Sequence, residues 1–105
     1  MLSVTRKHFI GASVLIGLLL VGIYLYLRSH SVETLLKKGD VFLSNYRFEE
    51  SRQAYEKASQ LDPKNAQAYE GWALALWSQG KFDKAIKKHE RALQLDPKYV
   101  KALDG

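Results

Sequence analysis

The sequence contains no cysteine, which excludes disulfide bonds, thiolate zinc sites and a cysteine nucleophile. Cysteine usage therefore assigns the chain to neither an oxidising nor a reducing compartment. Proline is nearly as rare, because the 105 residues include only Pro63 and Pro97. A glycine-rich phosphate-binding loop is also missing. What remains is a short chain with room for one small domain.

The residues of a catalytic site do not fall together in this sequence. His8 and His30 bracket an apolar run, and His89 takes a position typical of a half-buried packing side chain. Glu49 and Glu50 open a predicted helix, where the helix dipole favours negative charge. No nucleophile, base and orienting group can be assigned. The sequence therefore predicts a protein that is not an enzyme and that needs no cofactor or metal.

The net charge of +5 comes mainly from the N-terminal part of the chain. Of sixteen lysines and arginines, Arg6, Lys7 and Arg28 flank the apolar run, which leaves thirteen against eleven acidic residues from Ser29 onward. A nucleic-acid binder would concentrate its basic surplus in the folded domain. The balance therefore argues against a nucleic-acid partner.

The apolar run from Phe9 to Leu27 has nineteen residues without a charge. As a helix it spans roughly 28 Å, close to the hydrocarbon thickness of a bilayer. We therefore expect an N-terminal tail at 1–8 and a single-pass transmembrane helix at 9–27. The alternative is a cleaved signal peptide, but the run exceeds a usual h-region and no small-x-small cleavage site precedes Arg28.

Residues beside and within this run bear on topology and contacts. The positive-inside rule compares Arg6 and Lys7 with Arg28, Lys37, Lys38 and Arg47, and it favours a cytoplasmic location for the domain that follows. A linker at 28–31 is too short to hold that domain far from the membrane. Ser13 and Gly17 form a small-xxx-small pair that could contact another anchor helix.

A 34-residue repeat organises the rest of the chain. The segment QLDPK at Gln60 returns at Gln94, and aligning 32–65 with 66–99 places Phe48 on Phe82 and Ala58 on Ala92. Small residues at equivalent places allow two antiparallel helices to approach closely. The pattern predicts an all-α fold with helices near 32–44, 49–61, 66–79 and 82–95. Ser31 is the expected N-cap of the first, and Gly80 the stop of the third.

The repeat resembles the tetratricopeptide repeat, in which paired helices stack into a solenoid. The matching residues are Leu35, Gly39, Phe42, Phe48, Ser51, Tyr55, Ala58 and Pro63, then Tyr69, Trp72, Ala73, Leu76, Phe82, Ala85, Ala92 and Pro97. The resemblance implies two repeats, at 32–65 and 66–99. Residues 100–105 are then the start of a third repeat or a capping helix, with the beginning of a longer repeat array as the alternative. Ile86 and Leu93 lie on the flank expected to be exposed, where a second copy or another partner could bind.

Two surfaces are predicted to bind partners. By the resemblance, the first helices line a groove for a protein partner, formed by Leu36, Asp40, Leu43, Glu70, Leu74, Trp77 and Lys101. A basic stripe for anionic lipid or an acidic partner follows from the helical spacing of Lys84, Lys87, Lys88 and Arg91. The groove favours a membrane-anchored scaffold or adaptor that recruits a protein to the bilayer. The alternative is a small structural subunit of a membrane complex, held by its anchor and its incompletely capped second repeat.

Overall fold

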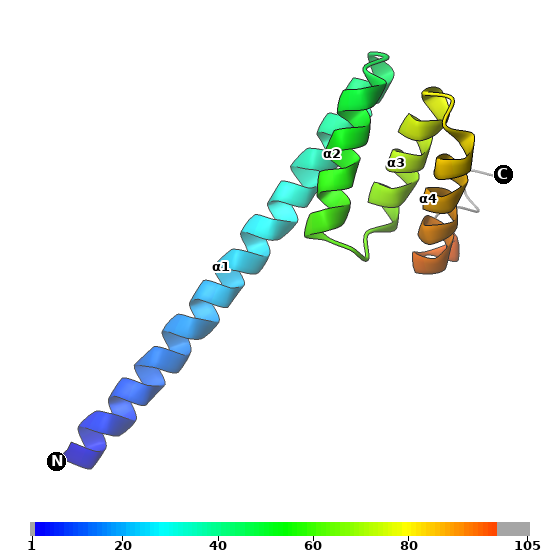
Figure 1. Ribbon diagram of the computed structural model, residues 1–105. Helices are drawn as coiled ribbons and strands as arrows, with labels where there is room; N and C mark the ends of the chain where they lie inside the picture. Colours follow the sequence, from blue (N-terminus) through cyan, green and yellow to red (C-terminus); the bar gives the residue numbers. More distant parts are fainter. Residues whose placement is uncertain (1, 99–105) are drawn as a thin grey trace. The chain divides into compact units, whose positions relative to one another are not determined.

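The computed structural model describes residues 2–98, with side chains from residue 10 onward. This range contains four helices and no strand. The helices are α1 (Leu2–Ser44), α2 (Phe48–Leu61), α3 (Ala66–Ser78) and α4 (Phe82–Leu95) (Figure 1). The all-α prediction is confirmed, and the last three helices begin and end within one residue of their predicted limits. Residues 99–105, where a third repeat or cap was expected, lie outside the described range.

The chain divides into two units, of which the first ends at His30 and the second begins at Ser31. Residues 28–31 are helical and belong to α1, so Ser31 is not the N-cap that the sequence predicted. The physical reason is local: from Arg28 to Lys38 the chain contains no proline or glycine to end a helix.

The first unit carries the apolar segment. From Ile10 to Leu27 every side chain is exposed, and the part of α1 from Ile10 to Ser44 is long and apolar enough to cross a membrane. N-terminal signal sequences share this length and composition. The segment therefore has the composition of a membrane span, and nothing within the first unit covers it.

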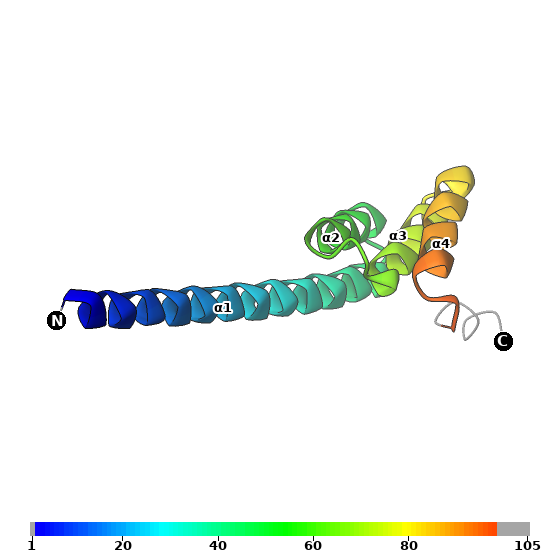
Figure 2. The ribbon, with the colours of Figure 1, turned by 90° about the horizontal axis from the view of Figure 1, so that it is seen from below.

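The second unit contains two helical hairpins. Residues 31–44 of α1 pair with α2, and α3 pairs with α4, while α2 also packs against α3 (Figure 1). Figure 2, turned by 90°, again shows α3 and α4 side by side. Each second helix ends at an aspartate whose carboxylate accepts a hydrogen bond from the backbone N–H two residues later. Lys64 N donates to Asp62 Oδ1 at 3.3 Å, and Lys98 N donates to Asp96 Oδ1 at 3.1 Å. The repeated LDPK segment is thus a repeated turn.

The tips of the two hairpins have the same backbone geometry. After α3, Gly80 adopts φ 78°, and Lys81 N donates to Leu76 O at 2.9 Å, which is a Schellman motif. After α1, the residue 34 positions earlier, Tyr46, adopts φ 62°, and Arg47 N donates to Phe42 O at 2.8 Å. The predicted stop at Gly80 is confirmed. Tyr46 occupies the same left-handed conformation without the freedom of glycine.

The core of the second unit is built around one aromatic side chain. Tyr55 on α2 is 1% exposed, and its ring lies against Gly39 on α1 and Gly71 on α3. A Cβ added at Gly39 would come within 2.7 Å of the ring, so only glycine fits there. Ser51 Oγ donates to Gly39 O at 2.8 Å and closes the same contact. Val32, Leu36, Ala58 and Ala68 complete the cluster. The inter-repeat contact therefore depends on small residues on both neighbours of Tyr55.

Candidate functional site

A cavity of about 440 Å³ opens on the side of the second repeat that faces away from α2. It is lined from α3 and α4 by Glu70, Ala73, Leu74, Trp77, Ala85, Ile86 and His89. We call this set the stacking face. Each of its residues lies 34 positions after one of the first repeat: Leu36, Gly39, Asp40, Leu43, Ser51, Arg52 and Tyr55. In the first repeat α3 packs against this surface, whereas in the second repeat its equivalent is open as a cavity among the described residues.

The floor of the stacking face is polar. Glu70 is 4% exposed, and its Oε2 lies 2.9 Å from His89 Nδ1. A buried carboxylate requires a partner, because taking an unpaired charge out of water is costly. The equivalent residues in the first repeat are Leu36 and Tyr55, which pack without an ion pair. The second repeat therefore replaces an apolar contact with a carboxylate–imidazole pair.

The rim of the stacking face is apolar. Leu74, Trp77 and Ile86 are 45%, 56% and 48% exposed. The Trp77 ring meets the Phe82 ring edge-on, with centroids 4.6 Å apart. This contact restricts the indole and lowers the entropy that a binding event would cost. The arrangement suits an apolar helix that covers the rim and places a polar or small residue near the floor.

The groove predicted from the sequence is divided by the structure. Glu70, Leu74 and Trp77 lie on the stacking face. Leu36 is instead buried in the core cluster, and Asp40 accepts a hydrogen bond from the Tyr55 hydroxyl. Leu43 is half-buried, and Lys101 lies outside the described residues. Little of Leu36 or Glu70 is accessible, because Leu36 packs in the core cluster and Glu70 is 4% exposed and pairs with His89.

Of the two residues predicted to form an exposed flank, Ile86 lies on the stacking face and Leu93 does not. Ile86 lines the same cavity as Leu74 and Trp77, so two surfaces that the sequence separated form one. Leu93 is half-buried and does not line it. The Glu70–His89 pair was missed by sequence reasoning. A comparison of the two repeats could have indicated the pair, because Leu36 and Tyr55 of the first repeat are replaced together by Glu70 and His89 in the second.

The basic stripe is also divided. Lys84, Lys87 and Lys88 line a second cavity with Lys81, whereas Arg91 lies 5.8 Å from the Tyr69 ring centroid and donates to Gln94 Oε1 at 3.3 Å. In the first unit, Ser13 and Gly17 lie on the exposed apolar segment, and a Cβ added at Gly17 meets nothing within 4 Å. Among the described residues, no group of three histidine, cysteine or acidic side chains could hold a metal ion.

One ion pair on α2 has a marked electrostatic effect. Arg52 Nη2 donates to Glu49 Oε1 at 2.6 Å and Arg52 Nε donates to Glu49 Oε2 at 3.0 Å, and Gln79 Nε2 donates to Oε2 at 2.7 Å. These hydrogen bonds, that of Arg52 above all, lower the pKa of Glu49 from 4.5 to about 2. The same pairing raises the pKa of Arg52. Glu49 is therefore ionised at any physiological pH, and its charge is balanced locally.

Comparison with known proteins agrees with this architecture. Residues 36–100 match a family model described as tetratricopeptide repeat, which covers more than half of the chain. A search of curated proteins gave no match.

Proposed function

Because the chain belongs to the tetratricopeptide repeat family, whose members act as protein–protein interaction modules, we propose that it is a membrane-anchored adaptor. The apolar segment from Ile10 to Leu27 crosses the bilayer once as an anchor, with the repeat unit on the cytoplasmic side. The stacking face binds a helix of a protein partner and brings that partner to the membrane. No chemistry is carried out in the repeats.

The observation that carries this proposal is the exposure of Leu74, Trp77 and Ile86 around a cavity whose counterpart in the first repeat is covered by α3. Burying what is exposed of these three side chains contributes about 3 kcal/mol in total. That is less than association in solution usually costs. A shared membrane raises the effective concentration of two anchored proteins and offsets part of this cost. The membrane anchor thus makes binding at the small stacking face more favourable.

Helix α3 indicates what kind of helix suits the site. It meets the first repeat through residues with small or absent side chains, since Ala68 and Ala75 are fully buried and Gly71 lies against Tyr55. These positions follow an i, i+3, i+7 pattern along one face. We expect the partner helix to present small residues with this spacing to the stacking face, flanked by an apolar side chain that reaches Trp77.

Site-specific crosslinking tests the proposal. The full chain, with a photoactivatable benzophenone side chain at Ile86, is expressed in native membranes, and crosslinked peptides are identified by mass spectrometry. We expect a helical segment of one membrane-associated protein, and its loss in the Leu74→Glu, Trp77→Ala variant. The matched control is Val41→Glu, Tyr46→Ala, which removes the same side-chain classes at exposed positions of the first repeat.

Crosslinks that survive the stacking-face variant but disappear in the control would overturn the adaptor proposal. Crosslinks from Ile86 to residues 99–105 of the same chain would also overturn it, because the face would then be covered internally. Crosslinks to a second copy would identify a homo-oligomer instead of a recruited partner.

A second function is favoured by one feature of the stacking face. Its first-repeat counterpart is a permanent interface, so the same geometry suits a structural subunit that stays buried in a membrane complex. The two functions differ in the stability of the isolated chain. An adaptor persists when its partner is depleted, whereas a subunit is degraded or aggregates. Pulse–chase measurement of the chain after partner depletion separates them.

A further inference from the structure

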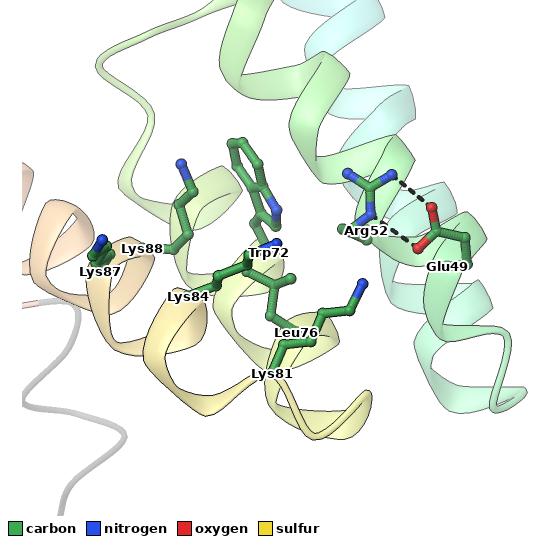
Figure 3. Close-up of a pocket in the computed structure, with 8 residues that line it drawn as sticks. All are labelled: Glu49, Arg52, Trp72, Leu76, Lys81, Lys84, Lys87 and Lys88. Atoms are coloured by element: carbon green, nitrogen blue, oxygen red, sulfur yellow. Dashed lines mark hydrogen bonds and ion pairs between the residues drawn. The ribbon is translucent and has the colours of Figure 1, made fainter.

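A second cavity, of about 390 Å³, lies between α2 and α4 on the opposite side of the second repeat from the stacking face (Figure 3). One wall is Lys81, Lys84, Lys87 and Lys88, which belong to α4 and the turn before it. Figure 3 shows Lys87 and Lys88 on one side of Trp72 and the Arg52–Glu49 pair of α2 on the other, with Lys84 and Lys81 below the indole. We call this site the lysine cleft.

The two walls differ in charge. On α2, Arg52 forms ion pairs with Glu49 and Glu56, so that wall carries no unbalanced positive charge. On the α4 side, none of the four lysines forms an ion pair with an acidic side chain among residues 10–98. The lysine cleft therefore has a surplus of positive charge on one wall, and a negatively charged ligand would complement it.

The surplus is not a requirement of the fold. Thirty-four residues earlier, α2 carries Glu50, Gln53 and Ala54 at the positions of Lys84, Lys87 and Lys88. Helix α2 forms the same hairpin without these charges. The lysines are thus specific to the second repeat, and a helix-stabilising role does not explain their position.

The base of the cleft is apolar. Trp72 is half-buried and Leu76 is buried beneath it, and the first repeat has Lys38 where the second has Trp72. Lys88 Nζ lies 3.8 Å from the Trp72 ring centroid, a cation–π contact that holds the ammonium against the indole. The ligand must therefore offer both negative charge and an apolar group that can reach the indole.

From these contacts we propose that the lysine cleft binds an acidic, partly apolar peptide segment of a protein partner, with its carboxylates on Lys84, Lys87 and Lys88 and an apolar side chain on Trp72. The contact of Lys88 with the half-buried Trp72 favours a peptide over a lipid surface, because a bilayer meets only groups that protrude. Arg91, which would extend the charge into a flat stripe, pairs with Gln94 and Tyr69 instead. This site is separate from the stacking face, and its occupation does not depend on the adaptor proposal.

The test uses the full chain in nanodiscs of phosphatidylcholine. The probe is a short fluorescein-labelled peptide of glutamates interspersed with leucine and phenylalanine, and the reference is its glutamine counterpart. We expect fluorescence anisotropy to give a Kd about tenfold lower for the glutamate peptide. Binding should weaken as salt is raised, because the contacts are largely exposed.

Charge-matched variants locate the site. Lys84→Gln, Lys87→Gln, Lys88→Gln should raise the Kd of the glutamate peptide about tenfold. The control Lys57→Gln, Lys64→Gln, Lys98→Gln loses the same charge at exposed positions outside the cleft and should change it less than about twofold. Trp72→Leu should weaken the glutamate peptide but not a peptide of glutamates alone. Leu74→Glu, Trp77→Ala should leave the binding unchanged, which separates this site from the stacking face.

Equal losses in the two lysine triples would overturn the proposal, because net charge alone would then account for binding. So would the absence of peptide binding together with protection of Lys84, Lys87 and Lys88 from amine-reactive labelling in nanodiscs that contain phosphatidylserine. That second result would assign the lysines to the membrane surface.

Discussion

Tyr55 on α2 lies so close to Gly71 on α3 that a Cβ at position 71 would overlap its ring. We therefore expect Gly71→Ala to destabilise the repeat unit by about 2 kcal/mol, since overpacking outweighs the better helix propensity of alanine. Urea unfolding of the full chain in detergent micelles, followed by circular dichroism, gives the free energy of unfolding.

Making room at Tyr55 should rescue this variant. In Gly71→Ala, Tyr55→Leu the loss should be smaller than the sum of the two single losses by about 1 kcal/mol, because the side chains contact each other. Strict additivity would show that the glycine matters for a reason other than the ring.

Tyr46 and Gly80 share the left-handed backbone at the two hairpin tips, with φ 62° and 78°. We expect Tyr46→Gly to stabilise the repeat unit by about 1 kcal/mol, because glycine adopts this conformation without steric cost. The loss of the edge contact between Tyr46 and Phe48 offsets part of the gain. The same urea titration measures it. Gly80→Ala is the matched control and should lower the free energy of unfolding by a similar amount. A Tyr46→Gly variant that is less stable than the unaltered chain, or a Gly80→Ala variant that is more stable, would contradict the assignment of strain.

The parts of the fold that the sequence predicted are those with a local cause. Gly80 and the two Asp-Pro turns end helices by their own backbone chemistry, so three helices were located to within a residue. The end of the first hairpin helix was placed at residue 44, and the structure ends α1 at Ser44. The continuity of α1 through 28–31 was not predicted, although no proline or glycine interrupts the chain there.

The site was predicted less well because it depends on neighbours. The same position in each repeat, Leu36 or Glu70, is buried for different reasons, by α3 in one case and by His89 in the other. Helical spacing places Lys84, Lys87 and Lys88 on one face, and in the structure they line one cavity. Helical spacing could not show that Lys81 joins the cleft or that Arg91 lies outside it. Lys81 lines the cleft together with Trp72, and Arg91 contacts Tyr69, and both aromatic residues belong to α3.

The hydrogen bonds to Glu49 make a prediction about pH. Because its pKa is lowered to about 2, the stabilising contribution of this group is complete above about pH 4.5 and is lost as the pH falls toward 2. Arg52→Gln removes the largest cause and should raise the pKa of Glu49 toward 4.5. A carbon-13 titration of the carboxyl group measures it. Lys57→Gln, which removes a cation without a bond to Glu49, should leave the pKa in place; a value still near 2 in Arg52→Gln would assign the shift to another group.

The Glu70–His89 pair makes the last prediction. His89→Leu leaves a carboxylate that is 4% exposed without its partner, so we expect a loss of about 2 kcal/mol or more in the free energy of unfolding. Glu70→Leu should cost less, because the half-exposed imidazole can turn to water. The double variant Glu70→Leu, His89→Leu leaves no buried carboxylate and should come closer to the stability of the unaltered chain than His89→Leu does.

Urea unfolding of the three variants decides whether the pair acts as a unit. A His89→Leu variant as stable as the unaltered chain would mean that Glu70 finds another donor or water. If the prediction holds, the double variant has an apolar floor beneath Leu74 and Trp77. Binding of helical peptides to the double variant then shows whether the carboxylate–imidazole pair contributes to specificity. Relative to the unaltered chain, a helix with a polar residue at the floor would bind the variant more weakly, and an entirely apolar helix would bind it more tightly.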